Sequence, residues 1–273
     1  MAWLPTHRAS LLMNIDKTQI ETNLRLHVDR LAGLIGARTL RRPKTIQATI
    51  GYIEGQWAEM GYKNTRETYD ALGDEATNLI VEQTGSESPE EIVLLGAHYD
   101  TVSTTPGADD NASAVAVLLE VSRLLKQHNY KRTVRYVAFA CEEPPNFNLD
   151  AMGSQYHARQ SRIRGDKIVG MLCLEMVGYY STAIGSQAIP PIIPKWMHRF
   201  FPKRGDFLAS VGNIPSWKLC WNFRRGFKRG ARKMPLFSIC LPEKNQSTDT
   251  PDTLDYPRMT EVTLGVASAI RSP

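Results

Sequence analysis

Residues 94–115 read LLGAHYDTVSTTPGADDNASAV, and this stretch decides the fold. It begins as an apolar run, which is typical of a strand buried on both faces, and it ends in small and aliphatic residues that favour a helix. Between the two lie His98, Asp100, Asp109 and Asp110. One histidine and three carboxylates therefore stand where a predicted strand gives way to a predicted helix.

Strands and helices alternate on both sides of this stretch. The sequence predicts helices at 111–126 and 150–162, and strands at 77–83, 91–98, 133–141 and 167–177, of which the second and the last read as buried. Such alternation predicts an α/β fold, with a mostly parallel (mixed) central sheet between two layers of helices. We therefore expect a three-layer α/β/α sandwich.

Helices are also predicted at both ends of the chain. Apolar residues that recur every three or four positions predict helices at 18–36, with a capping box of Thr18 and Glu21, and at 44–60. A last helix is predicted at about 257–270, with Pro257 in its first turn. We interpret residues 1–273 as a single domain with a basic, Pro/Gly-rich insertion at about 181–248, to which the sequence assigns no elements.

Composition narrows the class of protein. A chain of 273 residues with 42% hydrophobic content suits one large domain, and it holds no apolar run of the roughly 18 residues that a membrane span needs. The first residues do not resemble a signal peptide, which favours the cytoplasm over secretion. The four cysteines form no C-x-x-C pair, so a cysteine zinc site is not expected, and Cys141 and Cys173 lie in apolar runs that predict buried thiols.

The net charge of +5 is concentrated in one region. From Lys195 to Lys233 the chain is rich in lysine and arginine, with Asp206 as the single acidic residue. Such a stretch could bind nucleic acid or an anionic surface. Because it carries no nucleic-acid-binding module, we favour a solvated or substrate-facing insertion and expect no nucleic-acid partner. The sequence leaves the oligomeric state open.

Polar residues gather at the ends of the predicted strands. Parallel strands end at the same edge of a sheet, and ligands bind beyond that edge. The residues expected there are His98, Asp110, Glu142, Glu143 and Glu175. Taken singly, His98 could be a half-buried histidine, Asp110 a helix cap and Glu142–Glu143 a solvated pair. Together they favour a cation site, because neighbouring carboxylates repel one another and imidazole with carboxylate is a ligand set for zinc.

The same segments carry a resemblance to a known family. The stretches GAHYDTVSTTPGADDNASAVAVLLEVSRLL, AFACEE, LCLEMVGYYS and STDTPDTLDY resemble metallopeptidase family twenty-eight, the co-catalytic zinc aminopeptidases. The resemblance runs from about residue 20 to the C-terminus. It implies an α/β/α sandwich with a mixed sheet, zinc as cofactor, and a hydrolase that removes N-terminal residues from peptide substrates.

The resemblance also implies a role for each residue. His98 and Glu175 match ligands of the first zinc, Asp110 the aspartate that bridges both metals, and Glu143 a ligand of the second zinc. Asp100 matches the carboxylate that orients His98, and Glu142 the general base that takes a proton from water and passes it to the leaving amine. The family has a cis peptide where Asp110 is joined to Asn111.

The sequence departs from the family near its C-terminus. Relatives carry a second metal histidine before a DTPDTLDY-type segment, whereas this chain has Asn245 near that place and reaches the segment as if a few tens of residues were deleted. We therefore expect one well-formed zinc site, a weak second one and impaired activity. The alternative is a catalytically weak or inactive relative that acts as a binding or vestigial protein. His157 and His198 are expected at the surface, and related folds also serve carboxypeptidases and glutaminyl cyclases.

Overall fold

The computed structural model describes residues 16–147, 149–189, 195–212, 216–239 and 256–270. A central sheet has the strand order β1-β2-β4-β3-β5, formed by Thr65–Ala71, Asp74–Gln83, Arg132–Phe139, Ser88–His98 and Lys167–Cys173 respectively. β3 pairs in parallel with β4 and with β5, whereas β2 is antiparallel to both of its neighbours. β2 thus runs against the other four strands, and the sheet is mostly parallel but mixed, as the sequence predicts.

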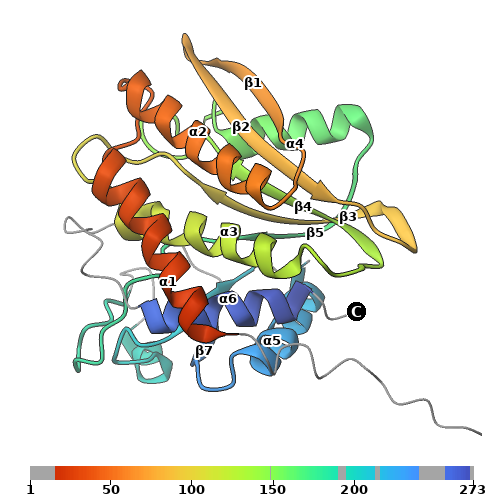
Figure 1. Cartoon of the computed structure of the whole chain (residues 1–273). Coiled ribbons are helices and arrows are strands. Elements are labelled where there is room, and N and C mark those ends of the chain that lie inside the picture. Colours follow the sequence, from red (N-terminus) through yellow and green to blue (C-terminus); the bar gives the residue numbers. More distant parts are fainter. Residues whose placement is uncertain (1–15, 148, 190–194, 213–215, 240–255, 271–273) are drawn as a thin grey trace, which may run out of the picture.

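The two faces of the sheet carry two apolar clusters, because successive strand residues point to opposite sides. Leu79, Leu95 and Tyr136 belong to the large core on one face, and Ile80, Leu94, Val137 and Phe139 form a small cluster on the other. The helices α2 (Pro43–Glu59) and α3 (Ala114–Leu125) cover the first face, and α4 (Gly153–Arg164) covers the second (Figure 1). The result is the three-layer α/β/α arrangement expected from the sequence.

Two more helices extend the first layer. α1 (Lys17–Val28) and α6 (Tyr256–Ile270) pack on each other and on α3 (Figure 1). Their buried apolar residues, among them Leu24, Val28, Met259 and Val262, continue the large core. The predicted helices at both ends of the chain are thus confirmed over these ranges.

The structure corrects how the first helix begins and ends. Asp16, and not a box of Thr18 and Glu21, caps α1: its side chain accepts hydrogen bonds from the backbone N–H groups of Thr18 and Gln19. The regular helix stops at Val28, and a wider turn, η1 (Asp29–Ile35), continues to Gly36. Aspartate is at least as favourable an N-cap as threonine, so the helix begins after Asp16.

The predicted burial of the strand at 167–177 is wrong. β5 stops at Cys173 and forms one edge of the described sheet, with Ile168, Val169 and Met171 36–45% exposed. The thiol of Cys173 is exposed as well, whereas that of Cys141 is buried as predicted. The apolar run predicts a strand correctly, but its composition does not reveal how much of it other elements cover.

The sequence assigns no helices or strands to residues 181–248, but the structure has four such elements in the described part of this region. They are η3 (Lys195–Phe200), β6 (Leu208–Val211), α5 (Trp217–Gly230) and β7 (Leu236–Ile239). β6 and β7 form a separate two-stranded parallel sheet, and α5 packs along α6. Phe227 and Met234 from this region belong to the large core. Within the described ranges, no helix is long and apolar enough to cross a membrane.

Candidate metal centre

His98 is the last residue of β3 and lies at the centre of a group of carboxylates. Its side chain is 2% exposed, and its Nε2 atom lies 3.3 Å from Asp110 Oδ1 and 3.3 Å from Glu175 Oε1. One ligand atom from each of the three residues lies within 4.8 Å of the others. Burial alone would lower the pKa of His98, but the facing carboxylates of Asp100, Asp110 and Glu175 outweigh it and hold that pKa well above its ordinary value.

The chain reaches this point from three separate segments. β3 ends at His98, η2 (Ala108–Ser113) carries Asp110, and Glu175 follows the end of β5. β3 and β5 are parallel neighbours, so both end at the same edge of the sheet. The peptide bond between Asp110 and Asn111 is cis, at the position that the resemblance indicates.

Asp100 lies behind His98 and links it to the loop after β4. Its Oδ1 atom is 3.4 Å from His98 Nδ1, and its two carboxylate oxygens accept hydrogen bonds from the backbone N–H groups of Glu142 and Glu143, each at 3.1 Å. Burial would raise the pKa of Asp100, but these partners hold it below its ordinary value. Asp100 is thus an ionised anchor for both the histidine and the Glu142–Glu143 pair.

Glu142 and Glu143 are carboxylates with raised pKa values. Burial is the main cause in both, and it raises the pKa of Glu142 to about 7 and that of Glu143 to about 8; nearby carboxylates add to the effect, while His98 opposes it. Glu142 Oε2 lies 3.8 Å from His98 Nε2. Glu143 is 4% exposed, and its buried Oε1 atom has no hydrogen-bond partner among the described residues.

Two residues to which the sequence analysis assigns no role, Asp109 and Asn111, hold the loop that carries Glu175. Asn111 donates from Nδ2 to Glu175 Oε2 and to the Leu174 carbonyl, each at 3.1 Å, and its Oδ1 accepts from the Met176 N–H at 3.1 Å. Asp109 Oδ1 accepts from the N–H groups of Gly178 and Tyr179 at 2.7 and 3.2 Å. Two neighbours of Asp110 therefore fasten η2 to the loop that carries Glu175.

The backbone is strained next to two of these carboxylates. Cys141, which precedes Glu142, has φ of 59°, and Met176, which follows Glu175, has φ of 45°. Side chains with a Cβ rarely adopt this left-handed region, and such residues are found preferentially at functional sites. The hydrogen bonds of Asp100 and Asn111 to these loops oppose relaxation of the strain.

A fully buried arginine supports the same edge from below. Arg38 is 0% exposed, and its guanidinium donates to the carbonyl oxygens of Tyr99 at 2.7 Å, Pro106 at 2.7 Å and Gly107 at 2.8 Å. Gly107 has φ of +64°, and a Cβ there would lie 2.4 Å from the Asp110 carbonyl oxygen. A lone arginine after Gly36 and Ala37 reads as a surface residue, so nothing in the sequence pattern reveals this role.

The residues present fit a zinc ion. One imidazole and two carboxylates converge there, and the unpartnered Glu143 oxygen lies on the adjoining loop. Imidazole and carboxylate are ordinary zinc ligands, and a cation would offset the repulsion among the carboxylates. Glu143 does not belong to the group of three, and the proposed C-terminal departure with Asn245 lies outside the described residues.

The remaining histidines lie elsewhere. The prediction that His157 lies at the surface is wrong. Its side chain is 2% exposed between α4 and the sheet, where its Nδ1 atom lies 2.8 Å from Glu67 Oε2. Its Nε2 atom faces Arg135, so both ring nitrogens are engaged in a polar network. His198 is partly exposed in η3. Neither histidine is part of the group formed by His98, Asp110 and Glu175.

Comparison with known proteins shows which family the chain resembles. Residues 78–195, which include His98, Asp110, Glu142, Glu143 and Glu175, match the model of peptidase family M28. The matched segment is less than half of the chain, so the match is a resemblance to this family. YfbL of Escherichia coli is 42% identical over 213 residues, which are 75% of this chain and 63% of YfbL. A probable zinc metalloprotease of Pyrenophora teres is 33% identical over 110 residues, 37% of this chain and 22% of the relative.

The chain thus spans less than two thirds of the length of these relatives. Among solved structures, the LapA aminopeptidase of Legionella pneumophila has a TM-score of 0.66 at 17% identity and covers 100% of this chain and 77% of LapA. An Acidobacteriales glutaminyl cyclase has a TM-score of 0.68 at 16% identity, over 99% and 98% of the two chains. At such identities these likenesses show the fold alone.

Proposed function

We propose that this chain is a zinc-dependent aminopeptidase, an exopeptidase that hydrolyses the N-terminal peptide bond of peptides. The observation that carries the proposal is the convergence of His98, Asp110 and Glu175 within 4.8 Å beside Glu142. The family is one of peptidases, and a relative is named as a probable zinc metalloprotease. The N-terminal direction of cleavage rests on the resemblance of the sequence motifs around His98, Glu142 and Glu175 to co-catalytic zinc aminopeptidases.

In this proposal His98, Asp110 and Glu175 hold one zinc ion. Asp100 fixes the imidazole through Nδ1, so that Nε2 faces the ion. Asn111 orients the Glu175 carboxylate through its Oε2 atom. Zinc bound there would lower the pKa of a water molecule and polarise the substrate carbonyl.

Glu142 is the proposed general base. Its side chain is 29% exposed, and it lies beside His98 without being one of the three clustered ligands. A carboxylate with a pKa near neutrality can accept a proton from water and return it to the leaving amine, since both transfers are then nearly balanced. Its backbone N–H is held by Asp100, which keeps the base at a fixed distance from the histidine.

The alternative is a family member with weak or no catalysis. It is favoured by one observation: in the described ranges no second histidine joins the group of His98, Asp110 and Glu175. A second metal held by Asp110 and Glu143 alone would bind weakly. The site would then hold one metal ion rather than two.

The two functions are separated by measuring zinc content and hydrolysis together. Purified protein is assayed with aminoacyl chromogenic substrates, with glutaminyl peptides as probes of cyclisation, and with and without added zinc. Zinc-dependent release of the chromogenic group supports the aminopeptidase. One bound zinc without hydrolysis supports the inactive alternative, and cyclisation without hydrolysis would replace the proposal by a cyclase.

A further inference from the structure

Helix α5 presents an exposed face that the proposed active site does not use. The face consists of Trp217, Lys218, Trp221, Asn222, Arg224, Arg225 and Arg229, all exposed, and we call it the α5 outer face. At 100° per residue these positions span about 160° of the helix circumference. The opposite side packs on α6, where Phe227 is fully buried.

Two tryptophans dominate this face. Trp217 and Trp221 are one turn apart and are 61% and 52% exposed. Large aromatic side chains usually bury most of their surface, so two exposed indoles side by side indicate a contact surface. Nearby on the edge strand β5, Val169 is 45% exposed and adds apolar area.

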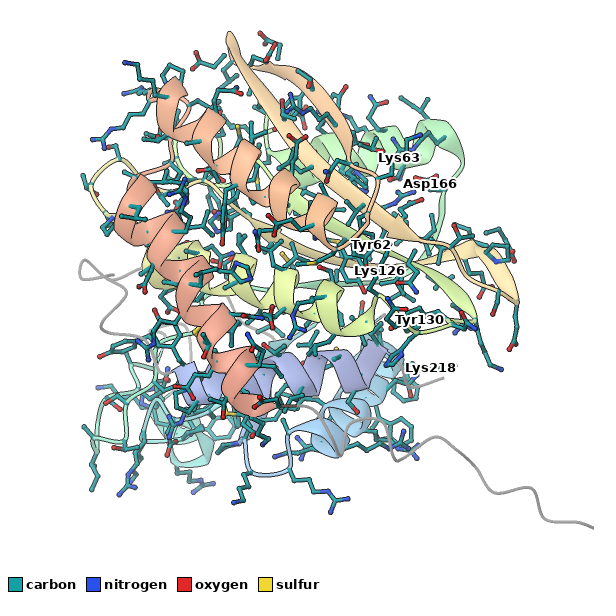
Figure 2. The ribbon with its side chains drawn as sticks, in the orientation of Figure 1. Tyr62, Lys63, Lys126, Tyr130, Asp166 and Lys218 are labelled. Carbon is teal, nitrogen blue, oxygen red and sulfur yellow. The ribbon has the colours of Figure 1, made fainter. Side chains whose placement is uncertain are left out.

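Each tryptophan ring is accompanied by a cation. The Arg225 guanidinium carbon lies 4.4 Å from the centroid of the Trp221 ring, and Lys218 Nζ lies 5.7 Å from that of Trp217. Lys218 and Val169 also line one cavity of about 280 Å³, which reaches Ile270 at the end of α6. Figure 2 shows Lys218 at this end of the molecule, well away from α2 and β1.

The charge along the stretch of sequence that carries this face has one sign. From Phe207 to Pro242 the sequence has no aspartate or glutamate, while it carries the cations of the α5 outer face together with Lys228, Arg232 and Lys233. A partner must therefore be anionic and must also accept two indole rings. A bilayer with anionic headgroups meets both conditions, since tryptophan favours the interface and lysine and arginine favour its negative surface.

We propose that the α5 outer face docks this protein on the surface of an anionic phospholipid bilayer. A helix of 14 residues is about 21 Å long and offers a convex, straight surface that can lie flat in the interface. Single-stranded nucleic acid fits less well. Base stacking needs an open ring face, and Arg225 already covers one face of the Trp221 ring.

The test is sedimentation of the full chain with phosphatidylcholine vesicles that contain or lack phosphatidylglycerol. We expect binding to the anionic vesicles, release at high salt, and a blue shift of tryptophan fluorescence on binding. Reversing two charges in Lys218→Glu/Arg225→Glu should weaken binding about tenfold or more, because each basic residue near such a surface contributes roughly one kcal/mol. Trp217→Ala/Trp221→Ala should weaken it as well.

The control variant is Lys63→Glu/Arg159→Glu. It makes the same change in net charge at two exposed side chains outside α5, and it should bind as the wild type does. Equal binding of the two double charge variants would overturn the proposal, as would equal binding to neutral vesicles. Binding of a single-stranded oligonucleotide without binding of vesicles would also overturn it. Thermal unfolding of each variant confirms that the protein is folded.

Discussion

The guanidinium of Arg38 donates a hydrogen bond to the backbone carbonyl of Gly107, 69 residues further along the chain, at 2.8 Å. The same group reaches the carbonyl of Tyr99, which lies between His98 and Asp100. One buried side chain therefore joins the segment that holds His98 to the segment that leads into Asp110. Its position is fixed in turn by the carbonyls of Leu31 and Gly36 at the end of η1.

We predict that Arg38→Met weakens both folding and zinc binding. Buried carbonyl oxygens that lose their donor each cost about 1–3 kcal/mol, and the loops that carry His98 and Asp110 lose their common support. Zinc affinity is measured by competition with a chelator, and stability by denaturant unfolding of the metal-free protein.

Arg135→Met is the matched control for this prediction. Arg135 is 6% exposed and pairs with Asp166, away from the proposed ligands. The Arg135→Met variant should have a lower free energy of unfolding, while its zinc affinity stays near that of the wild type. If both variants bind zinc as the wild type does, Arg38 does not position the metal site.

Glu142→Gln should lower kcat by about 10²–10⁴-fold without changing zinc content, because the proposed role of Glu142 is proton transfer and not ligation. Glu143→Gln should leave the first zinc in place and reduce the binding of a second ion. Both variants are assayed with aminoacyl chromogenic substrates and by elemental analysis. Wild-type turnover in Glu142→Gln would remove this residue from the mechanism.

Zinc should bind with a stoichiometry of about one per chain after dialysis, and His98→Ala should abolish it. Zinc at about a hundred times its Kd should raise the free energy of unfolding by about 2.7 kcal/mol, since the ion binds the folded state. His157→Gln is the control, because His157 is as buried as His98 but lies in the α4 network. Two tightly held ions per chain would contradict the single-site reading.

Acid should destabilise the protein through the network around Glu67. Burial would raise the pKa of Glu67, but hydrogen bonds from His157 and Arg164 outweigh it, so the folded-state pKa lies below the ordinary value of 4.5. The network therefore adds stability above pH 4.5, and this stability is lost as the pH falls through the lower folded-state pKa.

Glu67→Gln tests this dependence directly. The variant should be less stable than the wild type at neutral pH. Its free energy of unfolding should also change less than that of the wild type between about pH 5 and pH 3, the range in which carboxyl groups ordinarily titrate. Glu87→Gln, at an exposed side chain, is the control. Parallel pH profiles of Glu67→Gln and the wild type would show that this carboxyl is not responsible.

The grouping of His98, Asp110 and Glu175 follows from the sequence, because buried runs identify the strands and parallel strands deliver their ends to one edge. What supports that grouping does not follow. Arg38 reads as one more basic loop residue, and its burial depends on contacts with residues 61 and 69 positions away. Asp109 and Asn111 stand beside a predicted ligand, but their partners in the loop after β5 are set by tertiary packing.

The burial of side chains was the weaker part of the prediction. The apolar stretch that forms β5 reads as buried, yet the strand lies at the sheet edge, and a histidine on a polar helix reads as exposed, yet His157 is enclosed with Glu67 and Arg135. Residues 181–248 are rich in proline, glycine and basic residues, so no elements are assigned to them from the sequence. In α5, tryptophans are interspersed with arginines and lysines on the exposed side. The residues that face the core are therefore identified from the packing of α5 on α6 and not from the sequence.

The placement of α6 gives the order of synthesis a physical meaning. Every residue of the proposed metal centre leaves the ribosome by residue 175, but α3, which follows Asp110, packs against α6 at 256–270. A nascent chain that has emerged as far as Glu175 therefore has all the proposed ligand side chains but lacks α6, which packs on α3 and α1 in the complete fold. Until α6 emerges, α3 lacks one of the helices that cover its apolar side chains, so a chain truncated before residue 256 should expose apolar surface and be prone to aggregation.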